Sequence, residues 1–184
     1  MKNLLIPMLL LILSQQGHAQ DKYFTKTGYA KFYSEAPLEN IEAINNKVQS
    51  IIDMKRSEVV INLPITAFQF ENSLMQEHFN ENYMESEKFP LAKFQGYFVN
   101  GAPIDMTVDG SYEVQVKGKM TIHGVTKPLN IGGVIKVTDN NVLATTKFMI
   151  RVADYDIDIP TIVFRNIAEE VEVTIELQYM PLKS

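Results

Sequence analysis

The stretch Gly118-Lys119-Met120-Thr121-Ile122-His123-Gly124-Val125-Thr126-Lys127-Pro128-Leu129 decides the architecture of this chain. Runs of alternating apolar and polar residues flank it on both sides, and this period of two is typical of strands with one buried face. The apolar members are Tyr112, Val114 and Val116 before the stretch and Leu129, Ile131, Gly133, Ile135 and Val137 after it. Between the runs, Gly124 can adopt backbone angles closed to other residues, and Pro128 cannot donate a hydrogen bond to a neighbouring strand. The stretch therefore predicts a sharp bend or bulge between two long strands.

Strand composition recurs along the rest of the chain. Further strands are predicted at residues 21–34, 58–65, 91–100, 142–150 and 171–179. Gly28 predicts a bend or bulge within the first of them. Residues 41–52 carry Asn45-Asn46 in their middle, which predicts a strand, a tight turn and a second strand. Asp139-Asn140-Asn141 predicts another turn.

Residues 71–88 differ from these segments and predict the one helix of the chain. Ser73 with Gln76 three positions later matches a capping box, in which two side chains bond the free backbone N–H groups at a helix start. Met75, Phe79 and Tyr83 follow at four-residue spacing and so share one helical face. Phe89-Pro90 is expected to stop the helix.

About eight strands, one helix and no alternation of strands with helices predict an all-β fold. Its antiparallel sheet either closes into a barrel or forms a sandwich. A closed barrel of about eight strands can enclose one small ligand, whereas a sandwich fills its interior with side chains. Composition leaves both architectures open.

Length and charge limit the classes of function. The 184 residues suggest one domain with a sizeable core. The formal net charge is -5, and no cluster of Lys and Arg is present to follow a phosphate backbone, so nucleic acid is not an expected partner. The chain has no cysteine, so no disulfide stabilises it.

The N-terminus has the pattern of an export signal. Met1-Lys2-Asn3 is followed by an apolar run from Leu4 to Leu13 and by the small-x-small end Gly17-x-Ala19. A membrane span needs roughly 20 apolar residues, about twice this run. We therefore expect residues 1–19 to be a cleaved signal peptide, residues 20–184 to be the folded domain, and the protein to be periplasmic or secreted without stable membrane insertion.

Three motifs in order resemble the YceI-like family of exported lipid-binding barrels. The first is Thr121-Ile122-His123-Gly124-Val125-Thr126-Lys127-Pro128, preceded by Gly118, which resembles the signature hairpin of that family. The second, Glu87-Lys88-Phe89-Pro90-Leu91-Ala92-Lys93-Phe94, resembles its junction from helix to strand. The third, Phe148-Met149-Ile150-Arg151-Val152-Ala153-Asp154-Tyr155, resembles its strand that ends in Arg and an Asp-aromatic pair.

This resemblance implies an eight-stranded antiparallel, lipocalin-like β-barrel with one short helix near its mouth. It also implies a long apolar cavity that holds a polyisoprenoid or a similar lipid chain. Residues 75–84 are richer in Met and Asn than the family pattern, so the resemblance does not specify the ligand.

Apolar residues on the predicted inner faces are the candidate ligand-binding residues, because an isoprenoid or acyl chain offers only apolar surface to a protein. They are Met75, Phe79, Phe94, Phe98, Val114, Met120, Ile122, Phe148 and Ile150. The alternative is that these side chains fill a solid core. Gly96 and Gly118 would thin the wall and leave room for a ligand or a crossing backbone.

The polar candidates favour structural roles. His123 lacks partners at metal-ligand spacing and is expected to fix the corner by hydrogen bonding. His78 is expected on a solvated helix face, and Asp154 is expected to pair with Arg151. Neither a metal site nor a cofactor is predicted, and no catalytic arrangement can be assembled from these residues, so the chain is not expected to be an enzyme.

The predicted function is therefore sequestration or transport of a long apolar chain inside the barrel, the ligand being a polyisoprenoid, an isoprenoid quinone or a fatty-acyl lipid. The alternative is a ligand-free periplasmic interaction or stress-protective module with a filled core. An isomerase or hydrolase acting on a lipid would need a buried polar group with a shifted pKa, which the sequence does not reveal. The oligomeric state stays open, a dimer included.

Overall fold

Nine strands and a short helical segment make up the fold in the computed structural model, which describes residues 21–36, 40–99, 104–158 and 168–182. The strands are β1 (Lys22–Glu35), β2 (Asn40–Asp53), β3 (Glu58–Pro64), β4 (Gln69–Phe70), β5 (Leu91–Val99), β6 (Gly110–Ile122), β7 (Val125–Thr138), β8 (Asn141–Arg151) and β9 (Glu170–Pro181). The helical elements are η1 (Ile65–Ala67), α1 (Ser73–His78), η2 (Phe79–Tyr83) and η3 (Val152–Tyr155).

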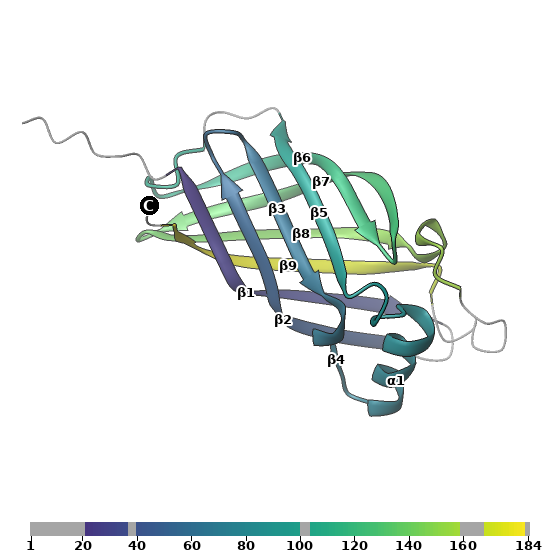
Figure 1. Cartoon of the computed structure of the whole chain (residues 1–184). Coiled ribbons are helices and arrows are strands. Elements are labelled where there is room, and N and C mark those ends of the chain that lie inside the picture. Colours follow the sequence, from purple (N-terminus) through teal and green to yellow (C-terminus); the bar gives the residue numbers. More distant parts are fainter. Residues whose placement is uncertain (1–20, 37–39, 100–103, 159–167, 183–184) are drawn as a thin grey trace, which may run out of the picture.

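Eight of these strands close into an antiparallel barrel, which confirms the predicted fold class and excludes the sandwich. The order is β1-β9-β8-β7-β6-β5-β3-β2, and β2 pairs with β1 to complete the circle. The two-residue strand β4 was not predicted and pairs with β2 at Ala43 and Ile44. Figure 1 shows α1 at one end of the barrel and the C-terminus near the other.

The corner between β6 and β7 is a two-residue hairpin turn, as its sequence predicts. Ile122 pairs with Val125, and the two residues between them have positive φ angles, 49° at His123 and 77° at Gly124. This combination is the mark of a type I′ turn, whose twist matches that of the flanking strands. The predicted turn between β7 and β8 is of the same kind, with φ of 50° at Asp139 and 63° at Asn140.

The predicted turn at Asn45-Asn46 is wrong, because β2 runs through it as one strand. Asn45 pairs with Ala30 of β1, and Val48 pairs with Gly28. Between these two pairs β2 advances by three residues and β1 by only two, so β2 carries one extra residue, a bulge. The Asn45 side chain is fully buried; Nδ2 donates to the Pro64 carbonyl at 2.8 Å and Oδ1 accepts from the Lys47 N–H at 2.8 Å. The Asn pair thus marks a bulge fixed by side-chain hydrogen bonds.

Replacing Asn45 with Leu should lower the free energy of unfolding by about 2 kcal/mol, because it removes the partners of two backbone groups. Urea denaturation checks this value. Asn46→Leu is the matched control, since the Asn46 side chain is exposed, and should change stability by less than about 0.5 kcal/mol. Equal effects of the two variants would contradict the structural role of Asn45.

The helical segment is shorter than predicted and starts differently. Asn72, not Ser73, caps α1, since its side chain accepts from the N–H groups of Leu74 and Met75. The predicted capping box is therefore wrong, and Gln76 instead accepts a hydrogen bond from the Phe70 N–H. The helix continues as the wider turn η2 and ends at Tyr83, well before Phe89-Pro90.

The interior of the barrel is divided into two halves. At the end away from α1, side chains from β1, β2, β7, β8 and β9 pack into a solid core, and Ser50 and Tyr179 share a buried hydrogen bond of 2.6 Å there. The largest fully buried apolar side chains are Val48, Ile52, Ile135, Val137 and Val142. The half nearer α1 is hollow.

Candidate binding cavity

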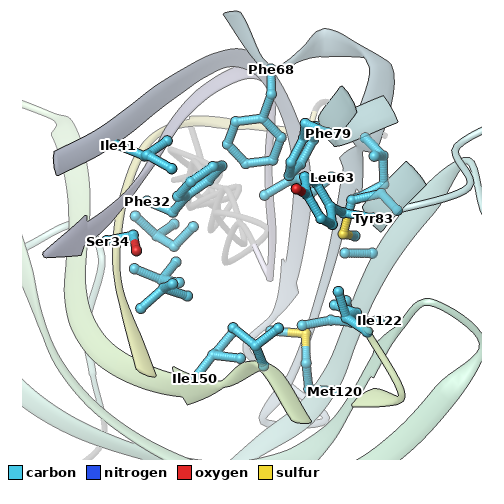
Figure 2. A pocket seen from close by; sticks show the side chains of 18 of the residues that line it. Phe32, Ser34, Ile41, Leu63, Phe68, Phe79, Tyr83, Met120, Ile122 and Ile150 are labelled. Atoms are coloured by element: carbon cyan, nitrogen blue, oxygen red, sulfur yellow. The ribbon is translucent and has the colours of Figure 1, made fainter. Parts of the chain in front are cut away.

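A cavity of about 300 Å³ occupies the hollow half of the barrel, and residues of the helical segment form part of its lining. Figure 2 shows side chains from several strands and from the helical segment pointing into it. Of its lining residues only Ser34, His78, Tyr83 and Thr146 carry a polar side-chain group. Volumes of this order, with an apolar lining and few polar groups, are typical of small-molecule sites.

Seven of the nine residues predicted to face a ligand line this cavity. They are Met75, Phe79, Phe94, Met120, Ile122, Phe148 and Ile150. Phe98 and Val114 do not line it; both are partly buried against the main hydrophobic core. Period-two alternation identifies which face of a strand is buried, but it contains no information on depth along the barrel axis.

An aromatic cluster that was not predicted from the sequence joins the helical segment to the barrel. The Phe79 ring lies 5.5 Å from that of Phe32, 5.6 Å from Phe68 and 5.0 Å from Phe70, measured between centroids. Such aromatic pairs add stability beyond the area they bury. The enrichment of Phe in residues 68–70 was the available signal. The other lining residues that were not predicted include Ile41, Ile61, Leu63, Val171 and Val173.

Gly96 and Gly118 lie against the ring of Phe94, which lines the cavity, and they do not leave room for a ligand. The two glycines are paired across β5 and β6. A Cβ atom at either position would lie less than 3 Å from the Phe94 ring and from neighbouring backbone. The Phe94 side chain, only 2% exposed, therefore occupies the space that the glycines open.

His123 ties three segments together at the cavity end of the barrel, which confirms its expected hydrogen-bonding role. Nε2 lies 2.8 Å from Glu85 Oε2, and Nδ1 lies 3.3 Å from the carbonyl oxygen of Tyr155. The imidazole also meets the edge of the Phe89 ring, with centroids 4.6 Å apart. The hairpin tip is thereby joined to the segment after η2 and to η3.

The other polar predictions have mixed outcomes. His78 is exposed, as expected, and also lines the cavity. Arg151 and Asp154 are both described, yet they form no ion pair with each other, so that prediction is wrong. Within the described ranges, no group of three His, Asp or Glu side chains is placed to hold a metal ion.

The Glu85 contact predicts a pH dependence of stability. The hydrogen bond from His123 holds the pKa of the Glu85 carboxyl below its usual range, and Lys88 adds to this effect. A lowered folded-state pKa means that this stabilisation is complete above the unfolded value of about 4.3 and disappears as pH falls through the lower folded-state pKa. Urea denaturation from pH 6 to pH 2 measures this effect. The urea midpoint of the wild type should be higher than that of Glu85→Gln at pH 6, and the two midpoints should be equal at pH 2.

Glu87→Gln is the control for this experiment, because Glu87 is an exposed neighbour of Glu85 and the ring nitrogens of His123 bond to Glu85 and to the Tyr155 carbonyl instead. It should follow the wild-type curve. A constant gap between wild type and Glu85→Gln down to pH 2 would show that the carboxylate of Glu85 does not supply the effect.

Comparison with known proteins identifies the family. Residues 28–179 match the YceI-like domain. No curated protein matches the chain. A structure described as a polyisoprenoid binding domain from Saccharophagus degradans, implicated in plant cell wall breakdown, is 14% identical, with 88% of this chain and 99% of that chain covered and a TM-score of 0.74.

Two further solved structures share the fold. BcnA of Burkholderia cenocepacia is 12% identical, with 83% of this chain and 96% of that chain covered and a TM-score of 0.67. The YCEI protein of Campylobacter jejuni is 16% identical, with 82% and 90% covered and a TM-score of 0.59. At these identities the likeness establishes the fold.

Proposed function

The chain belongs to the YceI-like domain family, and from that premise we propose that it binds a single long apolar chain, such as a polyisoprenoid, an isoprenoid quinone or a fatty-acyl lipid. The observation that carries the proposal is the apolar cavity of about 300 Å³ enclosed by the hollow half of the barrel. An apolar lining suits a hydrocarbon chain, because each CH₂ group that leaves water contributes about 0.8 kcal/mol to the free energy of binding and needs no hydrogen-bond partner. The relative described as a polyisoprenoid binding domain supports this ligand class.

The direct test is extraction of the purified protein with organic solvent, followed by mass spectrometry of the extract. We expect a lipid in a stoichiometric amount, or else uptake of added prenols, quinones or fatty acids by the empty protein. Repeated absence of both would overturn the proposal and would favour the ligand-free module with a filled core.

The volume of the cavity predicts a limit on chain length. An apolar cavity of about 150 Å³ holds one benzene molecule, so about 300 Å³ should hold roughly twice as many carbons, about 12. In a series of n-alkyl alcohols, affinity should rise about fourfold per CH₂ up to about this length and then level off. Calorimetric titration measures the series. Affinity that stayed flat from C6 to C12 would contradict binding in the cavity.

The helical segment is proposed to gate entry of the chain. It lies over the cavity end of the barrel (Figure 1), with Met75 and Phe79 lining the cavity. Phe79 holds it in place through the aromatic cluster, so opening has to break those ring contacts. Phe70→Ala should accordingly speed ligand exchange, as measured by displacement of a fluorescent fatty acid.

Export and localisation complete the proposal. Residues 1–19, proposed as a cleaved signal peptide, lie outside the described residues, and residues 20–184 form the proposed domain. The mature protein would act in the periplasm or outside the cell. N-terminal sequencing of the protein recovered from that compartment would identify the cleavage site. In the described part of the chain, no helix combines the length and the apolar character required to cross a membrane.

A further inference from the structure

The strand pairing between β7 and β8 stops partway along the barrel, beside the cavity. These strands pair only from Gly133 with Thr146 to Thr138 with Asn141. In the same register Gly132 would pair next with Lys147, but the ladder stops before it. Thus residues 125–132 of β7 and 147–151 of β8, all within the described ranges, have no strand partner on the sides that face each other. We call this interruption the β7–β8 slit.

The backbone of β7 presents hydrogen-bonding groups to the slit. Ile122 and Val125 flank a two-residue turn, so odd-numbered residues of β7 bond to β6 and even-numbered residues face the other way. The Gly132 carbonyl confirms this direction, because it accepts a hydrogen bond from Thr146 Oγ1 at 2.7 Å. Pro128, which has no N–H, occupies one of these outward positions, as expected of an unpaired edge.

A second hollow lies on the outer surface where the slit begins. Its lining includes Gln115, Gly132, Thr145, Lys147 and Thr174. Thr146 lines both this outer hollow and the inner cavity, and no other residue is shared by the two linings. The outer hollow, which carries several polar side chains, and the apolar inner cavity thus share one residue of the wall between them. This arrangement fits a molecule with an apolar tail and a polar head.

The charged side chains around the outer hollow limit which polar head group of a lipid can bind there. Glu113 lines it, and Lys147, the one cation of its lining, is already paired with Glu172 at 2.9 Å. A phosphate or carboxylate would meet two carboxylates and a lysine that is already bonded. The Gln115 amide and the hydroxyls of Thr145 and Thr174 instead offer hydrogen bonds to neutral oxygen.

We propose that the β7–β8 slit at Thr146 holds the head of the bound lipid, and that this head carries no negative charge and bears a carbonyl or hydroxyl oxygen, as in a quinone or an alcohol. This inference rests on the proposed function and adds the position and chemistry of the head. It concerns where the head rests once the ligand is bound; the tail can still enter past the helical segment.

The test compares heads on one tail: dodecanol, dodecyl phosphate and dodecane, titrated into the mature protein. Dodecanol should bind at least tenfold more tightly than dodecyl phosphate. Equal or tighter binding of dodecyl phosphate would overturn the inference while leaving the proposed function intact. Failure of dodecanol and dodecane alike to bind would instead overturn the proposed function itself.

Two variants locate the head without disturbing the core. Gly132→Val places a side chain in the outer hollow, where its Cβ would meet only the movable Gln115 amide, at 2.9 Å. It should weaken dodecanol at least fivefold and leave dodecane unchanged. Glu113→Lys should shift selectivity toward dodecyl phosphate at least tenfold, whereas Glu42→Lys, at an exposed position of β2 across the barrel, should not. Equal changes for dodecanol and dodecane in Gly132→Val, or no shift in Glu113→Lys, would place the head elsewhere.

Discussion

Val173→Trp should weaken binding of a C12 chain by more than 100-fold while leaving the barrel folded. Val173 lies on β9 between Phe32 of β1 and Phe148 of β8, and its side chain lines the cavity. An indole at this position takes the volume of several carbons of the ligand. Excluding four CH₂ groups at about 0.8 kcal/mol each removes about 3 kcal/mol of binding free energy, which is more than two orders of magnitude in affinity.

Stability should respond differently from affinity in this variant. The new ring enters space that is empty, so the strain of overpacking is small and is offset by the apolar area buried. We expect the free energy of unfolding to change by no more than about 1 kcal/mol. Calorimetric titration and urea denaturation give the two values on the same sample.

Gln178→Trp is the matched control, because Gln178 is exposed on the same strand. It adds the same side chain to the outside of the barrel and should leave affinity within twofold of wild type. A folded Val173→Trp protein that bound the chain as well as wild type would exclude the cavity as the binding site.

The elements that sequence predicts correctly are those whose causes are local. The turn at His123-Gly124 is determined by the residue that tolerates positive φ and by the alternating runs on either side. The strand at residues 171–179 is determined by its own period of two. In both cases the physical reason lies within about ten residues, so the pattern alone is sufficient.

The failures arise where a distant contact decides the local structure. Asn45 resembles a turn residue, but a carbonyl 19 positions away in the chain holds it in a bulge within β2. The end of the β7–β8 ladder has the same character: Gly132-Gly133 and Pro128 weaken the edge, yet only the closed barrel shows that β8 stops pairing there. Neither outcome can be obtained from the period of either strand.

The division of the barrel into a solid and a hollow half is the third such case. Phe98 and Phe148 both lie at inward positions of their strands, and nothing in the sequence distinguishes them. Their depth along the barrel axis distinguishes them, since Phe148 lines the cavity and Phe98 does not. The sequence therefore predicts the inner face well and the extent of the cavity poorly.

Phe94→Ala should have the largest effect on stability, a loss of about 3 to 5 kcal/mol in the free energy of unfolding. The Phe94 ring is 2% exposed and fills the space above the paired glycines, which cannot collapse onto the gap because their backbones are already in contact. The residual void borders the cavity and enlarges it. Chains longer than about 12 carbons should therefore gain affinity in this variant, although the protein is less stable.

Phe148→Ala is the matched comparison for Phe94→Ala, because both residues are phenylalanines whose rings point into the barrel. Phe148 is only partly buried and borders space that is empty already, so its removal should cost about 1 to 2 kcal/mol and should weaken every chain in the alcohol series. Urea denaturation and the chain-length titration measure both quantities for both variants. Equal losses of about 4 kcal/mol, with no change in chain preference, would mean that the hollow half is packed in solution, and the filled-core module would then be the better description of this barrel.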